Sequence, residues 1–161
     1  MTDTLIVYYS RTGKTRMVAE KLAAMLGADI EQILEQKPRH GFWGYLAGIK
    51  DSLLKRPAAL RSDHSVAGRK AVVIGMPVWA AAPPPAVRAY IEKVDLSAAK
   101  VFAFCTQEAS GGARLLKRLA ALLPAAPAAT LELSKPAKDS DLDSKLRAFA
   151  EIIEIIGTDP I

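Results

Sequence analysis

The sequence predicts an α/β fold in which a five-stranded parallel sheet carries helices on both faces. Apolar runs of strand length alternate along the 161 residues with segments of helical periodicity, which is the pattern of βαβ units. Half of the residues are hydrophobic, so the chain can bury a substantial core without a metal or a disulfide. We therefore expect a single doubly wound domain over residues 1–161, with the strand order 2-1-3-4-5.

The individual elements follow from local patterns. Strands are expected near residues 4–9, 29–34, 70–76, 100–105 and 128–133. Helices are expected near residues 13–26, 84–94, 111–122 and 141–156. The first helix has apolar residues at the spacing of one buried face, and Gly27 follows where a C-terminal cap belongs. Asp141 is a suitable first residue for the last helix, which Gly157 should end.

The loop after the first strand has the composition of a phosphate-binding loop. Residues 5–15 read LIVYYSRTGKT, an apolar strand followed at once by a hydroxyl-rich turn and a helical pattern. Such a turn directs free backbone N–H groups of the next helix toward one point, where the helix dipole also favours an anion. A nucleoside-triphosphate loop would need another glycine at Tyr8, inside the strand, so a single phosphate group fits better.

Three segments together resemble the flavodoxin family. Residues 9–15 (YSRTGKT) are similar to its phosphate loop. Residues 72–79 (VVIGMPVW), with 83–87 (PPPAV), are similar to its third strand and first flavin loop. Residues 102–106 (FAFCT), with Gly111 and Gly112, are similar to its fourth strand and second flavin loop. The loops that leave strands 1, 3 and 4 should meet at the carboxyl edge of the sheet, where such folds bind ligands.

The resemblance implies flavin mononucleotide (FMN) as the cofactor. The residues expected to contact it are Ser10, Arg11, Thr12, Gly13, Lys14, Thr15, Pro77, Val78, Trp79, Ala80, Ala81, Thr106, Gly111 and Gly112. Trp79 is the candidate to stack on the flavin ring, since a loop indole would otherwise be exposed; the alternative is packing under the turn at residues 83–85. Glu108 and Ser110 are further candidates for contact with the cofactor.

One departure from the family concerns the loop after the third strand. Residues 80–82 are alanines, so this loop lacks the glycine that lets electron-carrier flavodoxins flip a peptide toward the reduced flavin. Left-handed or flipped backbone is costly without glycine. The sequence thus argues against a stabilised one-electron-reduced flavin.

Other chemistries of related folds are disfavoured. A phosphoacceptor domain needs carboxylates at the ends of strands 1 and 3, where this chain has Tyr9 and residues 75–77. A thiol phosphatase needs an arginine six positions after its cysteine, and Gly111 stands six positions after Cys105. Cys105 is expected to be a small buried residue. His40 and His64 have no neighbours at metal-ligand spacing, so no metal site and no catalytic side chain is assigned.

The positive charge of the chain is concentrated in one segment. The sequence has 22 Lys and Arg against 17 Asp and Glu, a net charge of +5, and residues 37–61 hold six of the basic residues against Asp51 alone. We interpret this segment as a basic amphipathic crossover. It could pack on the sheet, form a lid or subunit contact beside the flavin, or lie on a membrane surface. Its large apolar face argues against nucleic-acid binding.

The function expected from the sequence is that of an FMN-dependent oxidoreductase. It would pass electrons from NAD(P)H or a partner reductase to a small acceptor such as a quinone. One alternative is a flavodoxin-type electron carrier that docks on redox partner proteins, although such carriers are typically acidic; another is a flavin-free interaction module. A single cysteine and the absence of a signal peptide or membrane span point to the cytoplasm. A homo-oligomer is compatible with the sequence.

Overall fold

A computed structural model describes residues 2–35 and 66–157. Its centre is a five-stranded, all-parallel sheet with the order β2-β1-β3-β4-β5, which confirms the predicted order. Because neighbouring strands run in the same direction, their carboxyl ends meet at one edge of the sheet. The strands are β1 (Thr4–Tyr8), β2 (Asp29–Gln32), β3 (Ala71–Pro77), β4 (Lys100–Gln107) and β5 (Ala129–Ser134).

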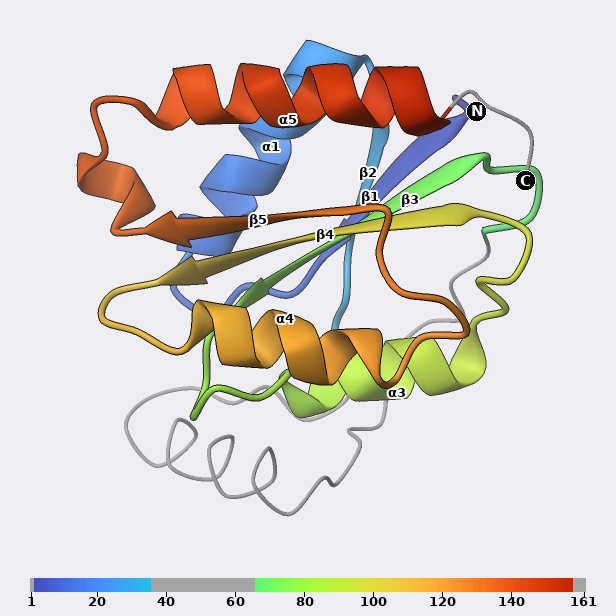
Figure 1. Ribbon diagram of the computed structural model, residues 1–161, viewed down its shortest axis with the longest axis horizontal. Helices are drawn as coiled ribbons and strands as arrows, with labels where there is room; N and C mark the ends of the chain where they lie inside the picture. Colours follow the sequence, from blue (N-terminus) through green and yellow to red (C-terminus); the bar gives the residue numbers. More distant parts are fainter. Residues whose placement is uncertain (1, 36–65, 158–161) are drawn as a thin grey trace.

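Helices cover both faces of the sheet (Figure 1). One face is covered by α1 (Lys14–Leu26) and α5 (Leu142–Gly157). The other face is covered by α3 (Pro85–Lys93) and α4 (Gly112–Ala120). A short 3-10 helix, η1 (Pro136–Lys138), joins β5 to α5 and was not expected from the sequence.

The alternation of side chains along the strands produces two hydrophobic cores. In β4, Val101, Ala103 and Cys105 pack toward α3 and α4, whereas Phe102 and Phe104 pack toward α1 and α5. All five are buried, because a strand of a parallel sheet covered on both faces exposes neither of its sides. The sheet is therefore a rigid platform from which the loops at its carboxyl edge project.

Glycines stand at the C-terminal ends of two helices, as expected from the sequence. Gly27 caps α1 in the left-handed conformation, with φ of 57°. Gly157 is the last residue of α5. A Cβ at Gly157 would lie 3.2 Å from the Cβ of Ala71, so this glycine permits close packing of the helix on β3.

The basic crossover predicted at residues 37–61 lies outside the described residues, as do His40 and His64. Over the parts of the chain that the structure describes, every helix is too short or too polar to span a bilayer.

Candidate functional site

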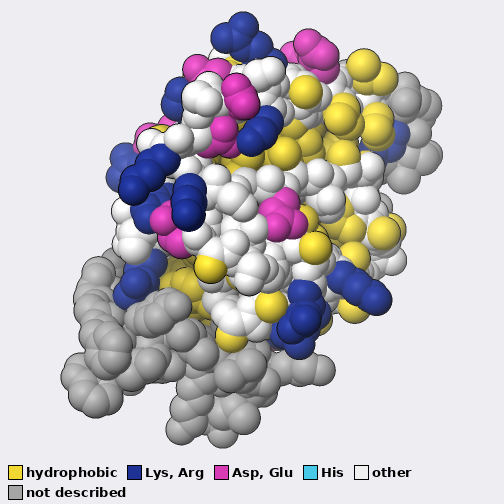
Figure 2. Space-filling model, turned by 60° about the vertical axis from the view of Figure 1, so that its left-hand side comes forward, with side chains coloured by type: hydrophobic (Ala, Val, Ile, Leu, Met, Phe, Trp, Pro, Cys, Tyr) yellow, Lys and Arg dark blue, Asp and Glu magenta, His cyan; other side chains and the backbone are white. Residues whose placement is uncertain are grey.

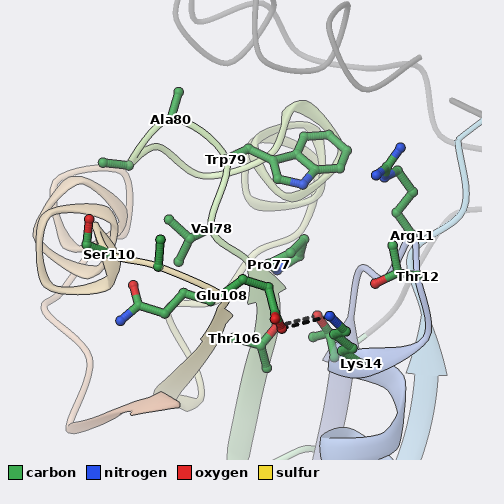
Figure 3. Close-up of a pocket in the computed structure, with 14 residues that line it drawn as sticks. Arg11, Thr12, Lys14, Pro77, Val78, Trp79, Ala80, Thr106, Glu108 and Ser110 are labelled. Atoms are coloured by element: carbon green, nitrogen blue, oxygen red, sulfur yellow. Dashed lines mark hydrogen bonds and ion pairs between the residues drawn. The ribbon is translucent and has the colours of Figure 1, made fainter. Parts of the chain in front are cut away.

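The three loops singled out in the sequence meet at the carboxyl edge of the sheet and enclose a pocket of about 480 Å³ (Figure 3). This volume lies in the range of small-molecule and cofactor sites. Figure 2 brings this end of the molecule forward and shows side chains of both charges close together on it. The pocket is lined by Arg11, Thr12, Lys14, Thr15, Pro77, Val78, Trp79, Ala80, Ala81, Thr106, Gln107, Glu108, Ala109 and Ser110.

The first wall of the pocket is the loop between β1 and α1. Gly13 precedes the helix in the left-handed conformation, with φ of 87°, and its N–H donates to Ser10 Oγ at 3.1 Å. The first helical hydrogen bond runs from the N–H of Met17 to the carbonyl of Gly13. The N–H groups of residues 14–16 thus have no hydrogen-bond partner within residues 2–35 and 66–157. They form a positively polarised helix end of the kind that binds anions.

The base of the pocket is fixed by a pair of hydroxyl groups. Thr15 Oγ1 and Thr106 Oγ1 are 2.8 Å apart, and both residues are buried. The carbonyl of Thr106 accepts a hydrogen bond from the N–H of Val78 at 3.0 Å. Thr106 therefore connects the first loop to the second. This connection fixes the positions of these two walls of the pocket relative to each other.

An ion pair spans the pocket from the first loop to the third. Lys14 Nζ lies 2.7 Å from Glu108 Oε1, and both side chains are about half exposed (Figure 3). The hydrogen bond from Lys14 holds the pKa of the Glu108 carboxyl below its usual value. Both residues line the pocket, so the ammonium group of Lys14 is already paired with a carboxylate there.

Trp79 borders the pocket, but it is buried rather than exposed. Only 4% of its surface is accessible, and its ring meets that of Tyr9 edge-on, with centroids 5.5 Å apart and an interplanar angle of 87°. The sequence expectation that this indole would be exposed unless it stacked on a ligand is therefore wrong. Tyr9, at the end of β1, supplies the packing partner, and stacking of Trp79 on a cofactor stays a prediction.

The second loop contains a strained tight turn at residues 79–82. The N–H of Ala82 donates to the carbonyl of Trp79 at 3.0 Å, and the central residues Ala80 and Ala81 have φ of 50° and 53°. Positive φ at both central positions is typical of type I′ turns, in which Asn and Gly are preferred. The left-handed backbone that the sequence argued against is therefore present here without glycine.

Replacing Ala80 by glycine should stabilise the protein. The left-handed region costs alanine about 1–2 kcal/mol, whereas glycine enters it freely but loses about 0.5–1 kcal/mol in backbone entropy. We expect the free energy of unfolding to rise by about 0.5–1 kcal/mol in urea denaturation. Ala80 is exposed, so no packing is lost. A lower free energy of unfolding would contradict the assigned conformation.

Comparisons with solved structures agree on the fold. A protein of Bacteroides uniformis described as a flavoprotein has a TM-score of 0.79 at 23% identity, over 92% of this chain and 97% of its own. A flavoprotein of Lactobacillus acidophilus, solved with FMN, has a TM-score of 0.70 at 15% identity, over 88% and 96% of the two chains. An NADH:FMN oxidoreductase has a TM-score of 0.61 at 14% identity, over 96% and 90%. Neither protein-family models nor curated protein sequences give a match.

The fold is flavodoxin-like. In this fold the carboxyl edge next to strand 1 is the point where the strand order reverses and where ligands bind. The pocket of this chain lies at that point, between the loops that follow β1, β3 and β4.

Four of the predicted contact residues do not line the pocket of this flavodoxin-like fold. Ser10 and Gly13 shape the first loop from within. A Cβ at Gly111 would lie 3.1 Å from the Cβ of Ala81, and one at Gly112 would lie 2.5 Å from Cδ of Glu132. The structure thus gives both glycines a packing role at the start of α4, and their contact with a cofactor stays a prediction.

Gln107 and Ala109 also line the pocket, within the loop of residues 106–112 whose backbone was expected to contact the cofactor, although neither side chain was singled out. Gln107 is buried, and its Nε2 donates to Glu132 Oε1 and Ser134 Oγ of β5. Its Oε1 accepts the N–H of Gly112 at 2.9 Å. The side chain thus links β5 to the start of α4. The signal in the sequence that could have pointed to this role is a polar residue immediately after Thr106, at the end of a buried strand.

Cys105 is buried in the sheet, as expected from the sequence. Desolvation by burial raises the pKa of its thiol to about 12. A thiol with this pKa is protonated at neutral pH, which disfavours nucleophilic attack and metal binding. Over the described ranges, the structure contains no cluster of three or more His, Cys, Asp and Glu residues suited to a metal ion.

Proposed function

We propose that the protein is an FMN-binding flavoprotein that transfers electrons from NAD(P)H to a small acceptor. The observation that carries this proposal is the pocket itself, in which the positively polarised end of α1 faces two loops from β3 and β4. Ten of the predicted contact residues line it, from Arg11 in the first loop to Thr106 at the end of β4. The similar flavoprotein of Lactobacillus acidophilus was solved with FMN, which supports the same cofactor here.

In this proposal the phosphate of FMN binds to the loop of residues 10–15. The free N–H groups of residues 14–16 and the hydroxyl of Thr12 would donate to its oxygens, and Lys14 would supply a positive charge. The flavin ring would lie between residues 77–81 and residues 106–110. A bound flavin supplies hydride and electron transfer, while the protein supplies position and electrostatics.

Two observations bear on the electron donor. Similarity to an NADH:FMN oxidoreductase favours a nicotinamide donor. The sequence has no glycine-rich dinucleotide fingerprint, so NAD(P)H would have to approach the exposed face of the flavin. An electron carrier with a protein partner is a second candidate, which similarity to flavodoxins favours.

All five strands belong to one sheet, which supports a single domain over residues 1–161.

A spectroscopic experiment tests the proposal. The protein is incubated with FMN and desalted, and its visible spectrum is recorded anaerobically before and after addition of NADH or NADPH. Retained flavin that bleaches directly would support the oxidoreductase. Retained flavin that stays oxidised would favour the carrier, and a colourless protein would refute the proposed cofactor.

Replacing Glu108 by glutamine should strengthen FMN binding. The substitution removes the carboxylate that competes with the phosphate for Lys14. Exposed ion pairs of this kind are weak, so we expect the Kd for FMN at neutral pH and low salt to fall by about two- to fivefold. Fluorescence quenching of FMN measures the effect. Glu20→Gln is the matched control, because Glu20 pairs with Arg16 outside the pocket.

The advantage of the Glu108→Gln variant should depend on pH. Because the pKa of Glu108 is lowered in the folded protein, its carboxylate stays ionised, and competes for Lys14, down to a pH below the usual glutamate range. The difference in Kd between variant and wild type should persist at pH 5–7 and disappear as the pH falls through the lowered pKa. A difference that does not change with pH would contradict the competition.

A further inference from the structure

A residue outside the pocket holds the strained turn of its second loop. Arg118 of α4 donates from one terminal nitrogen to the carbonyl of Ala81 at 2.9 Å and lies 3.5 Å from the carbonyl of Ala80. Its side chain is exposed, so it does not contribute to the core. Leu115 and Leu119 of the same helix are buried, and they fix the helix from which Arg118 reaches the turn. Figure 3 shows the turn at Ala80 beside this helix.

The turn needs support of this kind because its own sequence disfavours its conformation. Two consecutive alanines in the left-handed region cost a few kcal/mol together. One internal hydrogen bond, from Ala82 to Trp79, does not offset that cost. The close approach of Gly111 to Ala81 and the donor group of Arg118 are the contacts that hold the turn from α4.

We propose that Arg118 is a positioning residue that orients the carbonyl groups of Ala80 and Ala81 and thereby sets the reduction potentials of the bound flavin. This inference rests on the proposed FMN binding. Both alanines line the pocket, so their peptide groups belong to its wall. Arg118 directs the two carbonyls toward α4, and in this orientation they are engaged by its guanidinium.

The consequence follows from general flavin chemistry. When a flavin takes up one electron and one proton, its central ring gains an N–H donor, which a carbonyl acceptor in the pocket wall would stabilise. Carbonyls held by Arg118 are not available for this bond. The positive charge of Arg118 also favours the anionic, two-electron-reduced flavin. Both effects disfavour the one-electron-reduced state, so the flavin should take up electrons in pairs.

Hydrogen exchange on the flavin-free protein tests the positioning role. In Arg118→Ala, the amide of Ala82 should exchange about tenfold faster, because the turn that closes its hydrogen bond is no longer held. Arg118→Lys keeps a donor and should restore part of the protection. Arg114→Ala is the matched control, since Arg114 is exposed on the same helix and makes no hydrogen bond or ion pair within the described residues. Unchanged exchange in Arg118→Ala would overturn the proposal.

Potentiometric titration of the FMN-loaded protein tests the electronic consequence. Arg118→Ala should raise about tenfold the equilibrium constant for forming one-electron-reduced flavin from the oxidised and the two-electron-reduced flavin. This corresponds to about 59 mV of added separation between the two one-electron potentials. Arg114→Ala removes the same charge and should leave the separation near the wild-type value, while Arg118→Lys should be intermediate.

The two readouts separate the failure of this inference from failure of the proposed function. Faster exchange with unchanged potentials would overturn the electronic role of Arg118 while FMN binding stands. A wild-type protein that retains no FMN would refute the proposed function and the electronic role together, and the exchange data would still decide whether Arg118 holds the turn.

Discussion

Replacing Gly75 by alanine should destabilise the protein by about 3 kcal/mol, through a steric clash in the centre of the sheet. A Cβ at this position would lie 2.2 Å from Cζ of Phe104, and all three nearest atoms belong to that ring. Phe104 is fully buried opposite Gly75 in the register of β3 and β4, so the ring has no space into which it can move. For a chain of this size, the melting temperature should fall by about 6–12 °C.

A double-mutant cycle shows whether the clash is the cause. Phe104→Leu shortens the side chain that meets the new Cβ, so the Gly75→Ala/Phe104→Leu variant should lose less stability than the sum of the two single variants. Additive losses would mean that the glycine is required for another reason. The carbonyl of Gly75 accepts the N–H of Tyr9 at 2.9 Å. A shift of this strand should therefore also weaken FMN binding at the adjacent loop.

Replacing Gly13 by valine should reduce FMN affinity by about 10- to 100-fold, or abolish measurable binding. Gly13 has φ of 87°, and no atom lies within 4 Å of the position that a Cβ would take. The backbone conformation, and not a collision, therefore excludes valine, at a cost of about 1–3 kcal/mol. Relaxation of the loop would break the hydrogen bond from Gly13 to Ser10 and redirect the free N–H groups of residues 14–16.

The asparagine variant is the control for this conformational explanation. Asn tolerates the left-handed region better than other side chains, so Gly13→Asn should keep most of the affinity. Titration of FMN fluorescence gives the two affinities, and circular dichroism verifies that both variants are folded. Wild-type affinity in Gly13→Val would refute the placement of the phosphate at this loop. Equal losses in both variants would contradict the conformational explanation.

Local patterns were sufficient to predict the fold and the position of the site. The alternation of apolar runs and helical periodicity predicted a parallel sheet, and together with the family resemblance of the three loops it led to the strand order that the structure confirms. The hydroxyl-rich loop around Gly13 could be recognised because its geometry is local. It is determined by the end of a strand, a turn and the first residues of a helix, all within a few positions of one another. Interactions of this kind join residues that are close together in the sequence, so the local sequence pattern predicts them directly.

The features that the sequence did not predict depend on residues far apart in the chain. The buried Trp79 contacts the ring of Tyr9, which follows β1 and lies 70 residues earlier in the chain. The role of Gln107 depends on Glu132 and Ser134 in β5. The rule that left-handed backbone requires glycine gave the wrong expectation for Ala80 and Ala81, because Arg118 and Gly111 hold the turn from α4.

The sequence by itself therefore determined the architecture and the conformation of the hydroxyl-rich loop around Gly13, since both arise from hydrophobic periodicity and from the conformations of neighbouring residues. Only the tertiary structure decided which side chains face the pocket and how its second loop is shaped. Those outcomes are set by contacts between separate loops, and the free energy of such contacts exceeds the local preferences of the residues that they constrain.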